Sequence, residues 1–235
     1  MMPKIGIVCA SDSELKPFLS CMQQQTVHRK AMLDIHEGAL QGRDVAVVFS
    51  GVCKVNAAIA AQVLIDCCGV DFMINAGTCG GMDSSLDVFD TVIGTQVAYH
   101  DVSEDILTDF HPWMKSVYFA CDSELLAMAK RAVCGKELPF PVRFGTMVTG
   151  EAFITDDGRE EIQNRFAPLS VDMETAAVAH VCYANRIPFL AIRTVTDTLQ
   201  HSGTKNFEKN CEKASGIARD VTLLLLNELK AGITQ

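Results

Sequence analysis

The sequence predicts an α/β fold, a three-layer αβα arrangement around a central mixed, largely parallel sheet. Two observations carry this prediction. Short apolar runs alternate along the 235 residues with longer segments of helical pattern, and a repeated βα order is typical of this class. Several of the short runs are apolar without a two-residue alternation, as expected of strands that helices cover on both faces.

The strands are expected where β-branched and apolar residues cluster. The first such run, KIGIVCA, is followed by the polar sequence SDSE, and the last ends in the polar sequence RTVTD. The predicted strands, in chain order, are 4–10, 44–50, 70–77, 90–101, 142–150 and 188–197.

The helices are expected between these strands, with one more after the last strand. In the final segment, apolar residues recur at steps of three and four, which gives an amphipathic helix one apolar face. This face comprises Phe207, Cys211, Ala214, Ala218, Val221, Leu225 and Leu229. The predicted helices are 13–24, 54–68, 123–135, 158–166, 174–186 and 206–231.

No internal repeat, low-complexity segment or Pro/Gly-rich linker interrupts this order, so residues 1–235 are expected to form a single domain. The least regular part is 101–122, which holds the only tryptophan. We expect a long loop over the sheet edge there, and such loops bind or pair more often than they merely connect.

Composition and charge exclude several classes of protein. A formal net charge of -9 argues against a nucleic-acid or membrane-surface partner, which would favour a basic face. The apolar runs near the N-terminus and at VTLLLLNEL are too short for a signal peptide or a membrane span. The ten cysteines form no C-x-x-C and no converging spacing with histidine, which predicts reduced thiols, no metal site and a cytoplasmic protein.

The candidate site follows from what each strand delivers at its carboxyl end, where α/β sheets bind ligands. The first strand is followed by Glu14, the third by the glycine-rich sequence GTCGG, and the 142–150 strand by GEAFI. The sequence SVDMETAAV brings Asp172 and Glu174, and Asp197 closes the last strand. Acids and glycines with almost no cations predict a site for a neutral, hydroxyl-rich ligand.

Each of these features also has a purely structural interpretation. Glu14 fits a capping box with Ser11, Glu174 can complement the helix it opens, and GTCGG can be a tight turn. Phe153 can belong to the core, and Asp197 can cap a following turn. Asp197 is the strongest functional candidate, because desolvation raises the pKa of an acid in apolar surroundings and keeps it able to donate a proton.

The sequence resembles the 5′-methylthioadenosine/S-adenosylhomocysteine nucleosidases, which belong to the purine nucleoside phosphorylase-like superfamily. The resemblance rests on KIGIVCASDSE, SGVCKVNAA, INAGTCGGMDSSLDVFDTVI, YHDV, TGEAFI, VDMETAAVAHVC and RTVTDT. It covers about 4–200 and the region of Phe207, whereas 102–120 does not match.

The resemblance implies hydrolysis of the N-glycosidic bond of a 5′-thio-substituted adenosine, with water, no cofactor and no metal. Asp197 matches the general acid that protonates adenine N7, and Glu14 matches the residue that orients or deprotonates the attacking water. Glu174 would accept hydrogen bonds from the ribose hydroxyls, and Met173 would pack on the sugar. Asp172 is expected to face away from the ligand and support the structure.

The remaining residues of the site follow from the same resemblance. Phe153 would stack on adenine while the backbone of Ile154 reads the edge of the base. Thr78 stands where the family has a small hydroxyl residue near the acids, and Gly80 belongs to the same glycine-rich segment. Phe207 would line the base and help close the site. The family is typically homodimeric, so a homodimer is expected.

Three alternatives remain open. A phosphate-dependent nucleoside phosphorylase of the same fold would need Arg or Lys beside the glycine-rich turns, where the nearest cations are Lys16 and Lys54. Arg193 precedes Asp197 by four residues and is interpreted as part of the acid network. The unmatched 102–120 segment allows a nucleosidase for another 5′-modified adenosine. The third alternative is a non-catalytic nucleoside-binding protein, which could dispense with Asp197 or Glu14.

Overall fold

The computed structural model describes residues 3–111, 113–155, 158–201 and 203–231. Its strands form one ten-stranded mixed sheet in the order β10-β6-β8-β9-β5-β1-β4-β3-β2, with β7 paired to β6. The strands are β1 (Ile5–Cys9), β2 (Gln23–Lys30), β3 (Leu33–Leu40), β4 (Arg43–Phe49), β5 (Phe72–Gly81), β6 (Thr91–Tyr99), β7 (Tyr118–Ala120), β8 (Val142–Thr149), β9 (Ser170–Asp172) and β10 (Phe189–Asp197).

The centre of the sheet is parallel, because β1 pairs in parallel with β4 and β5, and β5 pairs in parallel with β10. The pairs β2–β3, β3–β4 and β10–β6 are antiparallel. Strand β10 contacts both β5 and β6, while β9 joins β5 to β8, so this end of the sheet curves back on itself. The predicted mixed sheet is confirmed.

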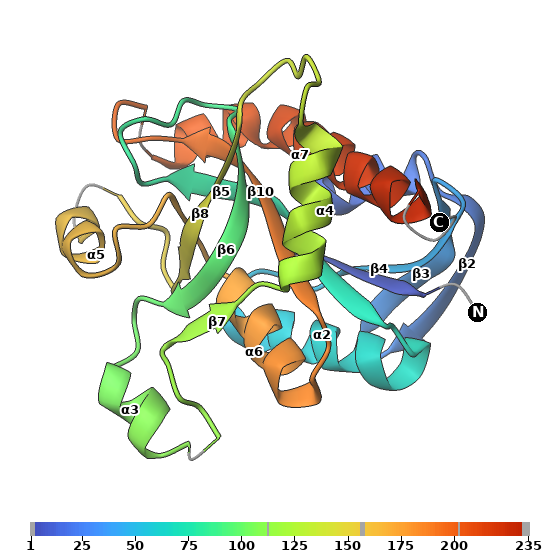
Figure 1. The fold of residues 1–235 in the computed structure, drawn as a ribbon, viewed down its shortest axis with the longest axis horizontal. Helices are drawn as coiled ribbons and strands as arrows, with labels where there is room; N and C mark the ends of the chain where they lie inside the picture. The colour runs from blue at the N-terminus through green and yellow to red at the C-terminus, as the bar shows by residue number, and fades with distance from the viewer. Residues whose placement is uncertain (1–2, 112, 156–157, 202, 232–235) are drawn as a thin grey trace.

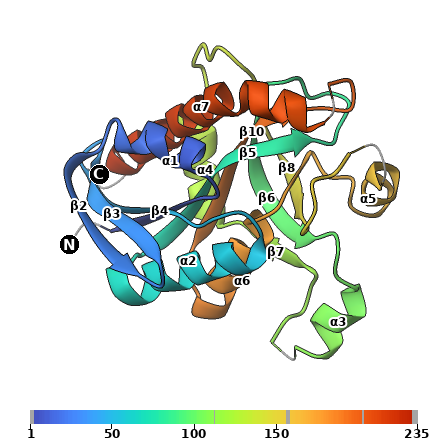
Figure 2. The ribbon, with the colours of Figure 1, turned by 180° about the vertical axis from the view of Figure 1, so that it is seen from behind.

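Helices cover both faces of the sheet and complete the predicted three layers. Helices α1 and α4 both pack against α7 on one face, and α2 and α6 pack together on the other (Figures 1 and 2). The helices are α1 (Asp12–Leu19), α2 (Lys54–Cys68), α3 (Glu104–Asp109), α4 (Ser123–Val133), α5 (Arg159–Phe166), α6 (Thr175–Asn185) and α7 (Thr204–Ala231). Within the described residues, none of these helices is long and apolar enough to cross a membrane.

The predicted strands and most predicted helices are confirmed, with shifts of a few residues at their ends. The helix predicted at 13–24 is wrong in its second half: α1 ends at Leu19, and β2 begins at Gln23. The hairpin of β2 and β3 had no prediction. All eight residues of β2 are exposed, so this edge strand carries no apolar alternation that would reveal it.

Two further expectations are corrected. The segment GTCGG is not a turn, since Gly77–Gly81 form the carboxyl end of β5. The segment 101–122 is not a continuous loop, because it contains α3 and β7, and β7 adds to the sheet along β6. Pro112, in the middle of that segment, lies outside the described residues.

Candidate active site

A cavity of about 210 Å³ opens at the carboxyl ends of β1, β5 and β10. Its walls also include the segments that follow β8 and β9 and the first turn of α7. All nine residues predicted for the site line it: Glu14, Thr78, Gly80, Phe153, Ile154, Met173, Glu174, Asp197 and Phe207. The topology therefore brings together residues that are up to 193 positions apart (207 − 14) in the sequence.

Glu14 is held rigidly between β1 and β5. Ser11 caps α1 by accepting a hydrogen bond from the Glu14 backbone N–H at 3.3 Å. The Glu14 carboxylate accepts from Ala10 N at 2.6 Å, and across the sheet from Thr78 N at 2.7 Å and Thr78 Oγ1 at 2.8 Å. The side chain thus satisfies a donor near the helix start and also faces the cavity, with 3% of its surface exposed.

The glycines of β5 make room for two of the acids. A Cβ on Gly77 would lie 2.3 Å from Oε1 of Glu14, and a Cβ on Gly80 would lie 3.3 Å from Oδ2 of Asp197. These glycines are needed for close approach of the carboxyl groups and not for a turn.

Arg193, on β10, lies at the centre of three carboxylates. Its guanidinium is 3.6 Å from Oε1 of Glu14, 3.7 Å from Oδ2 of Asp172 and 3.3 Å from Oε2 of Glu174. Burial opposes its charge, but the three carboxylates outweigh that effect and raise the pKa of Arg193. Arg193 therefore stays charged and neutralises part of the acid cluster.

Four of the five N–H groups of Arg193 donate hydrogen bonds within the protein, and Nη1 also faces Glu14. It donates to Thr175 Oγ1 at 3.1 Å, to the Thr78 carbonyl at 3.1 Å and to Asn75 Oδ1 at 2.6 Å, in addition to Glu174. Its side chain is 1% exposed. The geometry agrees with the interpretation of Arg193 as part of the acid network.

Asp172 fixes the start of α6. One of its oxygens accepts from Thr149 Oγ1 at 2.7 Å and from the backbone N–H groups of Glu174 and Thr175, both at 2.9 Å. The Thr175 hydroxyl donates to the other oxygen. This carboxylate satisfies free N–H groups at a helix start, which agrees with the supporting role expected from the sequence. Asp172 also lines the cavity, so the expectation that it faces away from the ligand is wrong.

Glu174 precedes α6, and its carboxylate points into the cavity. Oε1 accepts from Cys53 N at 2.9 Å, and Oε2 pairs with Arg193. Burial raises the pKa of Glu174 to about 7, opposed by Arg193 and assisted by Asp172 and Glu14. The group is thus close to the point of changing charge at neutral pH.

Asp197 ends β10 and is 1% exposed. Burial raises the pKa of Asp197, while the Thr196 hydroxyl, which donates to Oδ1 at 2.8 Å, and Arg159, at 4.0 Å from Oδ2, act in the opposite direction. The net increase agrees with the sequence-based expectation of a desolvated acid.

Phe153 and Phe207 form an aromatic wall of the cavity. Their rings meet edge to face with centroids 6.2 Å apart. Phe153 is 37% exposed, so it is not an ordinary core residue. An exposed ring at the wall of a cavity offers a face to a planar ligand.

Arg159 was missed by the sequence analysis. It opens α5 and is buried, with Nη1 donating to the Gly81 carbonyl at 2.5 Å. Its Nε and Nη2 have no hydrogen-bond partner among the described residues, and Nη2 faces Asp197. Nothing in the sequence GREEIQ distinguishes this arginine from a surface helix residue, because its burial depends on how α5 packs near β5.

Comparison with known proteins places the chain in a family. Residues 4–227 match the model of the phosphorylase superfamily. A 5′-methylthioadenosine/S-adenosylhomocysteine nucleosidase from a Marinomonas strain is 33% identical over 97% of this chain and 99% of its own length. The enzyme of the same name from Bacillus velezensis is 34% identical over 97% of this chain and 98% of its own length.

A solved structure agrees with these relatives. The nucleosidase of this name from Colwellia psychrerythraea, in complex with adenine, is 31% identical and superposes with a TM-score of 0.89, covering 97% of this chain and 96% of its own. The chain therefore belongs to the phosphorylase superfamily and, within it, to the family of 5′-methylthioadenosine/S-adenosylhomocysteine nucleosidases.

Proposed function

We propose that the protein hydrolyses the N-glycosidic bond of 5′-methylthioadenosine and of S-adenosylhomocysteine, releasing adenine and a 5-thio-substituted ribose. The names of the relatives and the adenine bound to the Colwellia enzyme support this substrate class. The cavity supports it independently, because an aromatic wall and a carboxylate cluster suit a purine at one end and sugar hydroxyls at the other.

The observation that favours hydrolysis over phosphorolysis is that Arg193 is already paired with carboxylates of the protein. It is the only arginine or lysine among the described residues that line the cavity, and three carboxylates surround it. A phosphate dianion would have to compete with Glu14, Asp172 and Glu174 for this one cation. Water carries no charge and needs only an acceptor, so the site favours water as the nucleophile.

In the mechanism we propose, Asp197 is protonated and donates its proton to N7 of adenine as the C1′–N9 bond breaks. A water molecule held by Glu14 attacks C1′, and its proton passes to Glu14. Glu174 accepts hydrogen bonds from the ribose hydroxyls, and its negative charge stabilises the positive charge that develops on the sugar. The raised pKa of Asp197 and the rigid carboxylate of Glu14 support these roles.

The remaining lining residues position the nucleoside. Phe153 and Phe207 would contact the base, and the backbone of Ile154 would read its edge. Met173 would pack on the sugar beside Glu174. We assign Thr78 a supporting role, since its hydroxyl and backbone N–H both donate to Glu14.

We further propose a homodimer, as is typical of the family that the sequence resembles. Val55 and Ile59 are exposed apolar residues of α2, and exposed Val52, just before α2, also lines the cavity. A partner on this face would cover apolar surface and border the cavity. Light scattering on the purified chain would measure a mass of about twice 25.6 kDa.

We also propose a cytoplasmic location, because the cysteines form no disulfide bonds. All ten cysteines are free, and five of them are buried. Free thiols persist in reducing compartments.

The experiment that tests the function is product analysis with 5′-methylthioadenosine, with and without phosphate. The proposal expects adenine and free methylthioribose in equal amounts, at a rate that phosphate does not change. Phosphate-dependent formation of the sugar 1-phosphate would instead identify a phosphorylase. Adenine release from another 5′-modified adenosine alone would retain the chemistry and change the substrate.

A further inference from the structure

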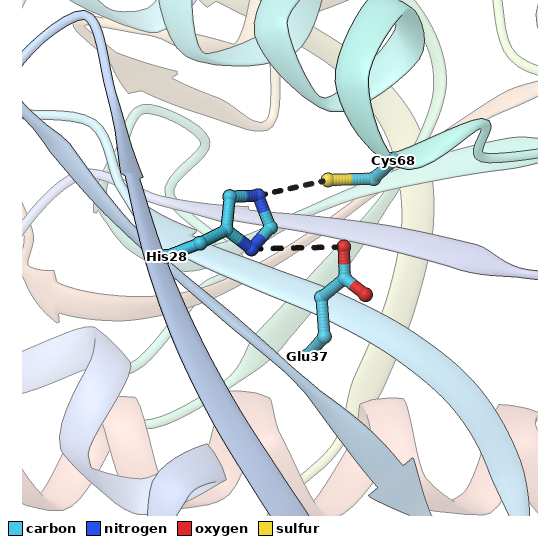
Figure 3. A group of neighbouring side chains, drawn as sticks. All are labelled: His28, Glu37 and Cys68. Carbon is cyan, nitrogen blue, oxygen red and sulfur yellow. Dashed lines mark hydrogen bonds and ion pairs between the residues drawn. The ribbon is translucent and has the colours of Figure 1, made fainter.

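Three potential metal ligands converge at the edge of the sheet. His28 from β2, Glu37 from β3 and Cys68 at the end of α2 each offer one ligand atom, and these atoms all lie within 4.8 Å of one another (Figure 3). Nε2 of His28 is 4.0 Å from Sγ of Cys68, and Nδ1 is 3.9 Å from Oε1 of Glu37. The three residues are far apart in sequence, so their spacing gave no metal-binding signal.

The strand register explains the convergence. Ile35 pairs with His28 and Glu37 pairs with Thr26, so His28 and Glu37 point to the same face of the hairpin. Ile35 is fully buried on that face, and Cys68 at the end of α2 approaches the same face. Helix α2 ends at Cys68, followed by Gly69 with φ of +62°, and this left-handed cap fixes where the thiol emerges.

We propose that His28, Glu37 and Cys68 bind one zinc ion or a similar borderline divalent metal, with water as the fourth ligand. A thiolate, an imidazole and a carboxylate form the mixed S, N, O donor set that Zn²⁺ accepts, whereas Mg²⁺ and Ca²⁺ prefer oxygen alone. Zinc bonds of about 2.0–2.3 Å place tetrahedral ligand atoms roughly 3.3–3.8 Å apart. Ligand atoms that now lie up to 4.8 Å apart must therefore move closer by about 1–1.5 Å.

His28 and Glu37 have the freedom for this movement. Their side chains are 43% and 28% exposed, whereas Cys68 is buried and acts as the fixed ligand. The two ring nitrogens of His28 now face different partners, so the ring must turn to direct one nitrogen at the metal. The same exposure gives the metal a path from solvent and room for a bound water.

Lys4 is the competitor for this site. Its ammonium pairs with Oε2 of Glu37 at 3.1 Å, so in the metal-free protein it supplies the positive charge that the metal would bring. Burial and the neighbouring Glu37 raise the pKa of the Cys68 thiol to about 12. Metal binding must therefore compete with Lys4 for the negative charge of Glu37, and it must release the thiol proton to solvent.

The metal site is separate from the catalytic cavity. Helix α2 begins beside the cavity, where Cys53 N holds Glu174, and its 15 residues span about 22 Å before reaching Cys68. A metal here would tie the exposed β2–β3 hairpin to α2. The consequence is stabilisation of the folded protein by the metal, with the active site left unchanged.

The test is titration of the chelator-treated full chain with Co²⁺ and Zn²⁺. We expect one equivalent of Co²⁺ to produce thiolate-to-cobalt absorption, which Zn²⁺ abolishes on replacing it. Cys68→Ser should remove this absorption, and His28→Gln should raise the Kd at least tenfold. Lys4→Met should lower the Kd, because the competing charge is gone.

Matched controls distinguish metal binding at Cys68 from metal binding at the other nine cysteines. Cys67→Ser changes the adjacent exposed thiol and should leave both stoichiometry and Kd unchanged. Circular dichroism of each metal-free variant verifies the fold, and His28→Gln alters an exposed side chain that the core does not need. Absence of cobalt–thiolate absorption, or the same absorption in both Cys68→Ser and His28→Gln, would overturn the proposal.

Discussion

Gly77 leaves the space that the carboxylate of Glu14 occupies. A Cβ on Gly77 would lie 2.3 Å from Oε1 and 2.6 Å from Oε2, closer than real Cβ contacts come. The glycine thus positions a catalytic candidate on another strand without touching a ligand itself, and its backbone φ is not in the left-handed region. Its role is steric.

Gly77→Ala should therefore displace Glu14 and lower kcat by about 10²-fold, the scale of losing one general base. The measurement is adenine release at saturating substrate. Gly216→Ala is the matched control: it lies in α7, where an added Cβ meets nothing within 4 Å, and should stabilise the protein by roughly 0.5–1 kcal/mol. Full activity in Gly77→Ala would show that Glu14 is not needed in its present place.

Asp197→Asn should lower kcat by roughly 10²–10⁴-fold, because the amide cannot supply the proton that adenine needs. Adenine binding, measured by calorimetry, should stay within a few-fold of the parent. Asp44→Asn, at an exposed position of β4, serves as the control. Parent-like turnover in Asp197→Asn would remove this residue from the mechanism.

Glu14→Gln should lose both activity and stability. The amide NH₂ must face either Ala10 N–H or the donors of Thr78, which costs roughly 1–3 kcal/mol in unfolding free energy. We expect kcat to fall by about 10²-fold or more as well. If urea unfolding shows the stability loss while kinetics stay unchanged, Glu14 is only a structural residue at the start of α1.

Glu174→Gln should raise KM and lower kcat. It should also remove the part of the pH dependence of the unfolding free energy that comes from Glu174. The folded-state pKa of about 7 lies above the unfolded value of 4.5, so the folded protein holds the extra proton between these values. The Glu174 contribution to unfolding free energy therefore falls as pH rises from 4.5 to 7. We therefore expect the unfolding free energy of the variant, relative to that of the parent, to be higher at pH 8 than at pH 5 by an amount on the order of 1–3 kcal/mol. Urea unfolding of both proteins at the two pH values measures this difference. An equal difference at both pH values would contradict this.

Arg159→Met should raise the pKa of Asp197 further, because the nearby positive charge is removed. The basic limb of the kcat/KM profile should move to higher pH, since Asp197 acts in its protonated form. Stability should change by about 1 kcal/mol or less, as one hydrogen bond to Gly81 is lost along with a buried charge. Arg131→Met, which breaks an exposed pair with Glu228, should leave the profile unmoved.

The sequence was most informative where burial leaves a pattern. Helix α2 was predicted with both ends correct, because Ala-rich periodicity runs from Lys54 to Cys68. The hairpin of β2 and β3 was not predicted, because the exposed, polar edge strand β2 has no hydrophobic alternation. Gly77 and Gly80 were interpreted as a turn, since glycines in a short window indicate turns more often than close side-chain approach.

The site was predicted residue by residue through the family resemblance, and all nine positions line one cavity. What the sequence could not supply was the arrangement around them. That Arg193 balances three acids, and that Arg159 faces Asp197, depends on packing between elements distant in sequence.

The position of β5, flanked by β1 on one side and β10 on the other, has a consequence for synthesis of the chain. Until β10 has left the ribosome, one long side of β5 lacks its parallel partner and exposes an apolar edge, a template for pairing with other chains. Truncations that end before Phe189 should therefore aggregate and yield no partly active enzyme. In this protein the last strand to be made both brings the proposed acid and protects the growing sheet.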